Sequence, residues 1–423
     1  MVMYETQPAL ISALDIGTGW TTAAIAQVDE DGQFALLGVG RAPSTGMRNG
    51  MVVNVKDTIA AIENAVIEAE TQAYIKMDGV FVSISGDHVR SLNNSGVISI
   101  GGNDTRRANH REITEGDVDR VLEQAKAITL PPDRQILHVL PQEFKVDHQS
   151  GIKDPVGHVG HRLEARVHLV TIVNTTAQNI VRCVEAAGLY LDELVLAPLA
   201  AAYSVLDQTE MDQGVVLIDM GAGTSDIIVY YDGGVRQTAV VPLGGNRITN
   251  DIAQVLHTTF QVAEALKKEH GYAKFPATME EVEITIEGIA GRQAKVTNRS
   301  GLAEIIEPRL EEILLLCRNE VRKSEVGDKL TFGVVLTGGS IQLREIEEKA
   351  GEVFNADIKL GYPADMKGLT QEATAPEFGV VTGLLRYGLL HGGGIPAGGN
   401  PAGMGSIVQN IGSQIKGFFK ELF

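Results

Sequence analysis

DMGAGTSD, residues 219–226, lies between the apolar runs VVLI and IIVYY. The same arrangement occurs earlier, where DIGTGWT, residues 15–21, separates ALISAL from TAAIA. Apolar runs of this length, bounded by glycine and hydroxyl residues, are typical of two strands joined by a tight turn. The sequence therefore predicts two β-hairpins, each with an aspartate where its first strand ends.

Both turns combine glycines, hydroxyl side chains and a strand-end carboxylate, and these groups together suit a polyphosphate. Glycine lets backbone N–H groups approach phosphate oxygens, and threonine or serine hydroxyls add further donors. Asp15 and Asp219 can hold Mg²⁺ through water, because this ion keeps most of its hydration shell in proteins. We expect the two hairpins to face each other and to clamp a polyphosphate from both sides.

A third glycine turn follows the buried strand FGVVLT and consists of Gly338, Gly339 and Ser340. Small residues at this place would let the flat face of an adenine lie against the backbone. A single turn of the phosphate type would more often be part of an ordinary hairpin. The pair of phosphate turns followed by this third element favours an ATP site.

The composition is that of a soluble globular protein with two or three domains. The chain has 423 residues, of which 44% are hydrophobic and 21% are charged. The formal net charge of −18 argues against broad binding to nucleic acid, which needs a basic surface. Cys183 and Cys317 are the two cysteines, and each lies in an apolar helical pattern. We expect buried thiols and a reducing, cytoplasmic compartment.

Hydrophobic periodicity gives the two halves of the chain the same plan, a hairpin followed by helices. It predicts long helical stretches at about 248–270 and 302–324 in the second half. Residues 87–165 differ in character, with histidines, paired arginines and paired prolines, and we expect an inserted subdomain there. The apolar stretch ARVHLVTIV then predicts a return to a buried strand of the first lobe.

The last 18 residues, SIVQNIGSQIKGFFKELF, predict an amphipathic helix after a Gly/Pro-rich linker at 390–405. At 100° per residue, one stripe holds the apolar side chains Ile407, Val408, Ile411, Ile415, Phe418, Phe419 and Leu422. Lys416 and Lys420 lie on the opposite face. A helix docked on the protein's own core is the alternative, but such a helix rarely needs a loose tether. We therefore expect reversible binding to an anionic membrane surface.

The order of phosphate turn, phosphate turn and adenosine turn resembles the actin, Hsp70 and sugar-kinase superfamily. The resemblance implies an α/β fold of two lobes that close over ATP and Mg²⁺. It places the nucleotide on Gly17, Thr18, Gly19, Trp20, Thr21, Gly221, Gly223, Thr224, Ser225, Gly244, Gly245, Asn246, Glu264, Lys267, Gly338, Gly339 and Ser340, with Asp15 and Asp219 nearest the metal. Glu264 and Lys267 match a pair that contacts ribose in relatives, although an exposed ion pair of a helix would have the same spacing.

Within this superfamily the chain looks like the bacterial cell-division protein family FtsA. The insertion follows the strand that ends in SISG, and the phrases LVLAPLAAAYSVL, PLGGNRITNDIA and EIIEPRLEEI resemble that family. The resemblance implies a protein that polymerises on the inner face of the plasma membrane, tethers the FtsZ ring and meets other division proteins. Its FtsZ contact, the C-terminal peptide of FtsZ, would fall on the second lobe's small subdomain, near Arg309, Arg318 and Asn319.

The resemblance also predicts the domain boundaries. The first lobe would comprise 1–86 and 166–203 with the insertion at 87–165, and the second lobe would comprise 204–246 and 331–389 with a small subdomain at 247–330. The linker would occupy 390–405 and the membrane helix 406–423. A pilus-assembly actin-like protein and a small-molecule kinase remain alternatives, because both share the nucleotide turns.

One position departs from the superfamily's pattern. Relatives that hydrolyse ATP quickly carry a glutamate or glutamine that orients the attacking water, and the matching stretch LAPLAAA has Ala197 in its place. An alanine side chain does no acid–base chemistry. We therefore expect ATP binding with slow or absent hydrolysis.

Overall fold

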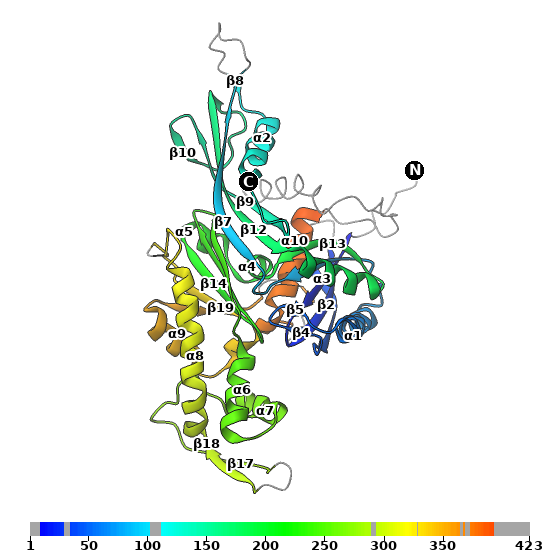
Figure 1. Cartoon of the computed structure of the whole chain (residues 1–423), viewed down its shortest axis with the longest axis vertical. Coiled ribbons are helices and arrows are strands. Elements are labelled where there is room, and N and C mark those ends of the chain that lie inside the picture. Colours follow the sequence, from blue (N-terminus) through cyan, green and yellow to red (C-terminus); the bar gives the residue numbers. More distant parts are fainter. Residues whose placement is uncertain are drawn as a thin grey trace.

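The computed structural model describes residues 9–28, 34–101, 111–288, 293–327, 329–363, 367–368 and 373–392. They form two lobes that lie beside each other, with an inserted subdomain extending from one end and a small helical subdomain from the other (Figure 1). The buried residues form three cores. One is centred on the first lobe and continues onto the second lobe's sheet through Val215, Leu217 and Ile228, one lies in the second lobe, and one lies in the insertion. This two-lobed α/β architecture confirms the predicted fold class.

The first lobe is built on a five-stranded sheet with the order β13-β6-β1-β2-β3. Its strands are β1 (Ala9–Ile16), β2 (Trp20–Val28), β3 (Phe34–Pro43), β6 (Gly79–Ile84) and β13 (Tyr190–Leu196). β1 and β2 are antiparallel and pair from Ala9 opposite Val28 to Ile16 opposite Thr21, so the predicted first hairpin is present. Nearby lies a short hairpin of β4 (Met47–Arg48) and β5 (Met51–Val52).

Helices cover both faces of this sheet. They are α1 (Val55–Ala73), α3 (Asn174–Ala186), α4 (Ala197–Val205) and α10 (Gly379–Gly392). α1 packs closely on β3, because Gly38 and Gly40 lack side chains there: a Cβ on Gly40 would lie 1.9 Å from the Ala65 carbonyl oxygen. α10 packs on β1, β2 and α4, and a Cβ on its Gly383 would lie 1.8 Å from the Ala200 carbonyl oxygen. The chain thus needs glycine where α10 crosses α4.

The inserted subdomain is a four-stranded sheet with the order β10-β9-β12-β7, covered by α2 (Glu115–Lys126). Its strands are β7 (Arg90–Ser99), β9 (Arg134–Val146), β10 (Gln149–Ile152) and β12 (Arg162–Val173), with a small pair of β8 (Arg111–Glu112) and β11 (Val159–Gly160). α2 begins with a capping box formed by Thr114 and Asp117.

The predicted end of the insertion at residue 165 differs from the structure. β12 pairs with β7 and β9 over its whole length, through Val173 opposite Arg134, and it belongs to the insertion's sheet. An apolar strand has the same sequence pattern in either sheet, so periodicity alone did not decide its partners. The first lobe resumes with α3 and β13.

The second lobe repeats the first with a five-stranded sheet in the order β16-β15-β14-β19-β20. Its strands are β14 (Val215–Met220), β15 (Ser225–Tyr231), β16 (Gly234–Val241), β19 (Val334–Thr337) and β20 (Ile358–Leu360). α5 (Gln208–Gln213), α8 (Arg299–Val321), α9 (Ile346–Phe354) and the short helices η1 (Gly339–Gln342) and η2 (Pro376–Phe378) complete it. Cys183 and Cys317 are both buried, as predicted.

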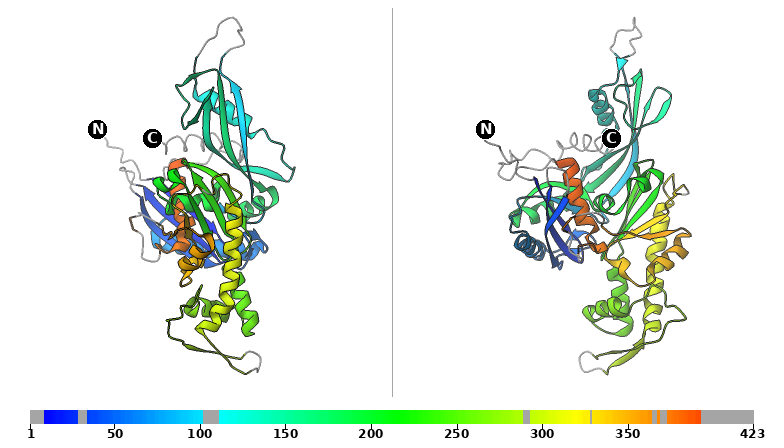
Figure 2. Two further views of the ribbon diagram at one scale, coloured as in Figure 1. Left: turned by 90° about the vertical axis from the view of Figure 1, so that its left-hand side faces the viewer. Right: turned by 180° about the vertical axis from the view of Figure 1, so that it is seen from behind.

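The small helical subdomain contains α6 (Gly245–Leu256), α7 (Phe260–His270) and the hairpin of β17 (Glu283–Ile286) and β18 (Lys295–Asn298), beside the far end of α8 (Figure 2). The single helix predicted over 248–270 is wrong, because two helices occupy it. His257 has a left-handed backbone (φ 52°) that ends α6, and the Thr259 side chain caps α7 by accepting from the Val262 N–H.

The chain's last described helix, α10, continues to Gly392 and so includes the first residues of the predicted linker. Residues 393–423, with all the predicted membrane-facing side chains, lie outside the described residues. Within the part of the chain that the structure describes, no helix has the length and hydropathy needed to cross a membrane.

Candidate functional site

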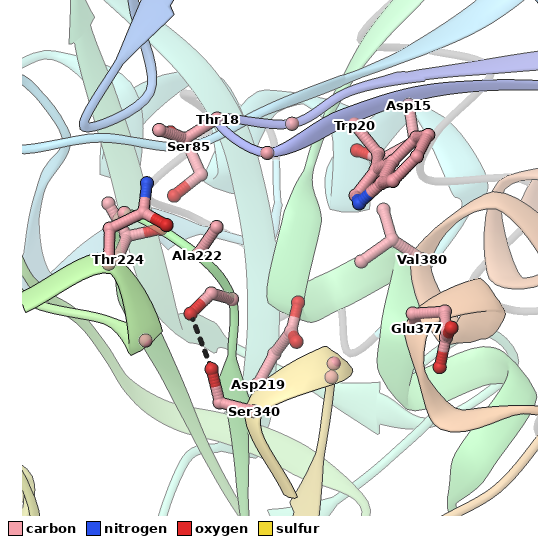
Figure 3. Close-up of a pocket in the computed structure, with 18 of the residues that line it drawn as sticks. Asp15, Thr18, Trp20, Ser85, Asp219, Ala222, Thr224, Ser340, Glu377 and Val380 are labelled. Carbon is pink, nitrogen blue, oxygen red and sulfur yellow. Dashed lines mark hydrogen bonds between the residues drawn. The ribbon is translucent and has the colours of Figure 1, made fainter. Parts of the chain in front are cut away.

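A cavity of about 390 Å³ lies between the lobes, where the turns of the two hairpins meet (Figure 3). Most residues predicted for the nucleotide line it. They are Asp15, Gly17, Thr18, Gly19, Trp20, Asp219, Gly221, Gly223, Thr224, Gly245, Asn246, Glu264, Lys267, Gly338, Gly339 and Ser340. Residues from both lobes and from the small subdomain thus converge on one space.

The first turn joins β1 to β2 and is closed by a hydrogen bond from the Gly17 N–H to the Trp20 carbonyl, at 3.0 Å. Thr18 accepts a hydrogen bond from the Gly50 N–H at 3.1 Å, which fixes its hydroxyl beside the cavity. Thr21 does not line the cavity, although Thr22 does. Alternate residues of a strand face opposite sides, so Thr21 turns into the lobe, where its hydroxyl lies 2.7 Å from that of Ser44.

The second turn repeats this geometry between β14 and β15, with the Gly221 N–H donating to the Thr224 carbonyl at 2.9 Å. Ser225 does not line the cavity, because its hydroxyl donates to the Leu243 carbonyl inside the lobe. Gly244 lies just before α6 and does not line the cavity. Gly245 and Asn246 do line it, and their N–H groups donate hydrogen bonds to carbonyls of the second turn.

The two turns touch across the cleft. A Cβ on Gly223 would lie 2.6 Å from the Thr18 hydroxyl, and one on Gly19 would lie 2.9 Å from the Ala222 Cβ. Ser85, at the end of the SISG strand, donates a hydrogen bond to Asp226 of the second hairpin. Only glycine leaves room for this approach, so the turns form a narrow backbone cradle.

Three carboxyl groups border the cradle and repel one another electrostatically; Asp219 and Asp226 are buried, and Asp15 is partly exposed. Burial raises the pKa of Asp15 to about 6, although a hydrogen bond from Ser83 and the charge of Arg41 oppose the shift. Burial likewise raises the pKa of Asp226 to about 6, against hydrogen bonds from Ser85 and Thr224. The pKa of Asp219 lies well above its usual value, because of burial and then the charges of Asp226 and Asp15.

This donor set suits Mg²⁺ held through water. Carboxylate oxygens are hard ligands, and a divalent cation would relieve the repulsion among them. Among the described residues, no three His, Cys, Asp or Glu side chains converge closely enough to chelate a metal without further ligands. The carboxylates fit an ion that also takes water and phosphate oxygens as ligands.

The turn after β19 forms another wall of the cavity, directly against the second hairpin. Gly338 has a left-handed backbone (φ 89°), and a Cβ there would lie 2.2 Å from the Asp219 Oδ1. Ser340 donates to the Gly221 carbonyl at 2.9 Å, which joins this turn to the second hairpin (Figure 3). The turn exposes backbone rather than side chains to the cavity, as a flat ring would require.

Glu264 and Lys267 form a 2.7 Å ion pair at the cavity wall rather than an exposed pair on a helix. Lys267 also donates to the Thr249 hydroxyl at 2.9 Å and to the Gly245 carbonyl at 3.2 Å. Burial lowers the pKa of Lys267. Burial acts to raise the pKa of Glu264, but the charge and hydrogen bond of Lys267, the Thr249 hydroxyl and the charge of Lys268 together lower it. The ion pair and these hydrogen bonds hold both side chains at the cavity wall.

Sequence reasoning missed a second link between the lobes. Arg41 of β3 lies over the Trp20 ring, 4.4 Å from its centre, and forms a 3.1 Å ion pair with Glu377 of η2. Glu377 in turn accepts from Gln342 of η1 at 2.5 Å. Arg41 has no motif that marks it, and Asp226 and Ser85 were present in quoted stretches without a role assigned to them.

The structure does not bring the three predicted partner-binding residues together. Arg309 bonds Asp251 of α6 at 2.5 Å, whereas Arg318 donates to the Val353 carbonyl of α9 at 2.9 Å. Arg318 follows Arg309 by nine residues, which is about two and a half turns of α8. The two side chains therefore lie on opposite faces of the helix. Asn319 is exposed on a third face.

Comparison with known proteins decides the family. Residues 86–171 match the model of the SHS2 domain inserted in FTSA, and residues 216–383 match the model of cell division protein FtsA. A relative named cell division protein FtsA from Escherichia coli K12 is 36% identical over 424 residues, which cover 98% of this chain and 99% of that protein. Those from Pseudomonas aeruginosa and Neisseria meningitidis are 39% and 40% identical, covering 90% of this chain and 89% and 90% of those proteins.

The chain belongs to the FtsA family. Solved structures support the fold of this FtsA chain independently. It resembles the PilM–PilN type IV pilus biogenesis complex with a TM-score of 0.64 at 17% identity, over 90% of this chain and 98% of that one. MreB5 of Spiroplasma citri bound to ADP gives 0.54 at 12% identity, over 90% of this chain and 96% of that one. At such identities these likenesses establish the actin-like fold alone.

Proposed function

We propose that this FtsA-family chain binds ATP with Mg²⁺ between its lobes and acts in bacterial cell division. The observation that carries the proposal is the glycine cradle bordered by three carboxyl groups, because such a site favours a polyphosphate with a cation. The turns at 17–20 and 221–224 would hold the phosphates through backbone N–H groups and hydroxyls. Asp15 and Asp219 would hold the hydrated metal ion, which supplies charge neutralisation.

The adenosine would lie on the backbone of Gly338, Gly339 and Ser340. Glu264 and Lys267 are positioned to meet the ribose from the small subdomain. Isothermal titration of the full chain with ATP and Mg²⁺ tests this placement. Gly338→Ala is expected to weaken binding at least about tenfold, because its Cβ would displace Asp219. Unchanged affinity would place the nucleotide elsewhere.

We also propose that hydrolysis is slow. Ala197 begins α4 and lines the cavity, and its methyl group cannot orient an attacking water. ATP then acts as a ligand that favours the closed lobes and so changes the contacts available to a polymer. A turnover above about one per second would contradict this.

We propose further that the chain polymerises at the cytoplasmic face of the plasma membrane and tethers the FtsZ ring there. The support is the amphipathic pattern of residues 406–423 and its tether to the body of the protein. One tail would bind weakly, and several tails on a polymer would add their effects. The C-terminal peptide of FtsZ would dock on the small subdomain, although Arg309 and Arg318 face opposite ways there.

Flotation with anionic liposomes tests the tether. The full chain with ATP and Mg²⁺ is expected to float, and a version ending at Gly405 is expected to stay in solution. If the shortened version floats equally well, the tail is not the anchor. We set the pilus-assembly and kinase alternatives aside, because the similarity to the three cell division proteins named above covers most of the length of each of them.

A further inference from the structure

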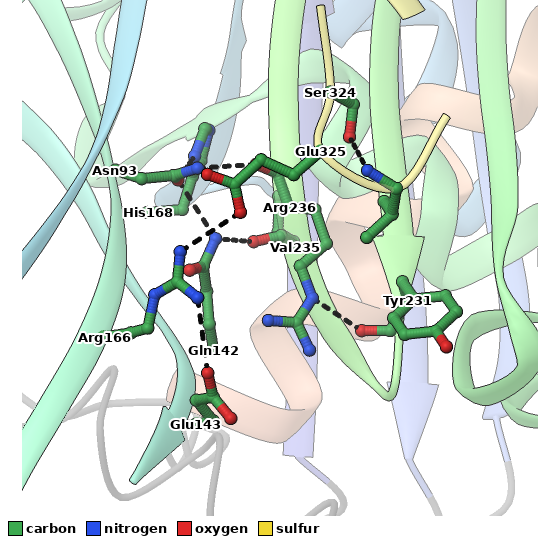
Figure 4. Close-up of polar contacts among 11 residues, drawn as sticks. Asn93, Gln142, Glu143, Arg166, His168, Tyr231, Val235, Arg236, Ser324 and Glu325 are labelled. Atoms are coloured by element: carbon green, nitrogen blue, oxygen red, sulfur yellow. Dashed lines mark hydrogen bonds and ion pairs between the residues drawn. The ribbon is translucent and has the colours of Figure 1, made fainter. Parts of the chain in front are cut away.

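The inserted subdomain touches the second lobe, although the chain connects it only to the first. β7 is an edge strand of the insertion's sheet, β16 is an edge strand of the second lobe's sheet, and the two lie beside each other. Figure 4 shows side chains of the insertion facing β16 across this seam, which we define as the contact between β7, β9 and β12 on one side and β16 on the other. An uncovered edge strand exposes backbone groups that readily pair with other chains.

Three side chains of the insertion donate hydrogen bonds to backbone carbonyls of β16. Ser91 donates to Thr238 at 2.8 Å, Asn93 donates to Arg236 at 3.1 Å, and Gln142 donates to Val235 at 2.8 Å. The insertion thus covers the edge of β16 with side chains in place of a paired strand. Gln142 is buried, so its bond is shielded from water.

Asn93 joins Gln142 and His168 into one network, because its Oδ1 accepts from the Gln142 Nε2 at 3.0 Å and also contacts the His168 ring. His168 is 2% exposed, with its Nδ1 2.7 Å from the Asn93 Oδ1 and its Nε2 2.9 Å from the Thr238 hydroxyl. The Asn93 Oδ1 only accepts, so Nδ1 carries the proton and Nε2 accepts from Thr238. Burial lowers the pKa of His168 to about 4, which keeps the ring neutral in this tautomer at physiological pH.

Ion pairs at the rim of the seam are weaker than this buried network. Arg166 of β12 lies 3.5 Å from Glu143 and 3.3 Å from Glu325, and all three side chains are partly exposed. Exposed pairs of this kind contribute little to stability. The neutral network of Asn93, Gln142 and His168 is therefore the specific part of the contact.

The insertion is rooted in the first lobe as well. The Leu196 N–H of β13 donates to the His138 ring of β9 at 3.0 Å, and the Asn174 N–H that begins α3 donates to the Asp133 carbonyl. One subdomain is therefore attached to both lobes. Any opening of the cleft that separates the lobes must either break the seam or bend the insertion.

We propose that the insertion is a latch between the lobes, and that Asn93, Gln142 and His168 hold it on β16. Lobe closure and the insertion's orientation are then coupled through this network. By reciprocity, a partner that pulls the insertion off β16 opens the cleft, and a ligand that closes the cleft fixes the insertion. The latch rests on the described contacts alone, and its effect on ATP also rests on the proposed function.

Paired spin labels test the latch in the full-length protein without nucleotide. Val97→Cys places one label on the insertion and Phe332→Cys places the other on the second lobe; both positions are exposed, and both native cysteines are buried. Asn93→Ala with Gln142→Ala is expected to broaden the distance distribution at least twofold. Asn94→Ala is the matched control, because that asparagine bonds Ala125 within the insertion and should leave the distribution unchanged.

Thr238→Val tests the same network from the second lobe, removing the hydroxyl that faces His168 while keeping a residue that strands favour. It should broaden the distribution in the same direction. Equal widths in the wild type and both seam variants would overturn the latch, as would equal broadening in Asn94→Ala.

The release of ATP from the double variant should be about fivefold faster. If the wild type does not bind ATP at all, the proposed function fails while the distance measurement still decides the latch.

Discussion

The two phosphate turns share one backbone plan but differ in their electrostatic surroundings. Each is closed by a hydrogen bond from its first glycine to a carbonyl three residues on. In the first turn, Asp15 has a hydrogen bond from Ser83 and the nearby charge of Arg41. In the second turn, Asp219 has Asp226 and Asp15 as its charged neighbours, and the pKa of Asp219 is raised further.

This difference teaches that a repeated motif does not make two equivalent half-sites. The backbone of both turns can bind phosphate oxygens, so the geometry is nearly symmetric. The unbalanced negative charge lies on the side of the second turn, and a divalent cation would relieve most repulsion there. We infer that the second turn contributes more to the metal dependence of binding than the first.

The largest expected effect is on ATP affinity, and it comes from placing a side chain where the two turns touch. Gly223→Ala would bring a Cβ within 2.8 Å of three atoms of Thr18, so the lobes would have to move apart. Calorimetry should show ATP affinity reduced about tenfold or more. Gly221→Ala is the control within the same turn, since its Cβ would meet only the Thr224 carbonyl at 3.4 Å. Equal losses in both variants would contradict a contact specific to Gly223.

A smaller effect is expected from Asp219→Asn, which should stabilise the nucleotide-free protein. Removing the carboxyl with the most unfavourable surroundings should raise the melting temperature of the nucleotide-free protein at pH 7 by a few degrees. Asp15→Asn should raise it less, because Ser83 and Arg41 already favour the charged form. Thermal unfolding without Mg²⁺ compares them, and a larger gain for Asp15→Asn would reverse the inferred asymmetry.

The same carboxyl groups predict a dependence of stability on pH. The folded-state pKa values of Asp15 and Asp226 are raised from 3.8 to about 6, so the folded protein binds more protons between about pH 4 and pH 6. Burial raises the pKa of Asp219 in the same direction. Their contribution to the free energy of unfolding therefore falls as pH rises through that window. Denaturant titrations should show little difference between wild type and Asp219→Asn near pH 4 and a growing advantage for the variant toward pH 7. A constant difference would exclude this origin.

The smallest effect is expected at Arg41, where the first turn meets η2. The ion pair with Glu377 is partly exposed, so Arg41→Gln should weaken ATP binding less than about fivefold. Trp20 is the chain's single tryptophan and lines the cavity, so its fluorescence should change when ATP binds. No change in the wild type at saturating ATP would remove Trp20 from the site.

Local motifs made much of this site predictable from sequence. A strand, a glycine turn and a second strand are encoded within about a dozen residues, and both hairpins are present as predicted. The contacts between lobes were not predictable in the same way. Ser85 and Asp226 are 141 residues apart, and Arg41 and Glu377 are 336 apart, so no local pattern relates them.

Two other differences have separate physical reasons. The break between α6 and α7 depends on a left-handed His257, a conformation that the apolar periodicity of the stretch does not encode. The opposite orientations of Arg309 and Arg318 could have been predicted, since helical geometry alone places residues nine apart on opposite faces.

The Mg²⁺ dependence of ATP affinity tests the unequal roles of the two turns most directly. Calorimetry of the wild type, Asp15→Asn and Asp219→Asn, each with Mg²⁺ and with a chelator, gives six affinities to compare. We predict that Mg²⁺ tightens binding to the wild type by about tenfold or more, that Asp15→Asn keeps most of this gain, and that Asp219→Asn loses it. If Mg²⁺ tightens ATP binding equally in Asp219→Asn and in the wild type, the second turn does not have the larger role in metal dependence.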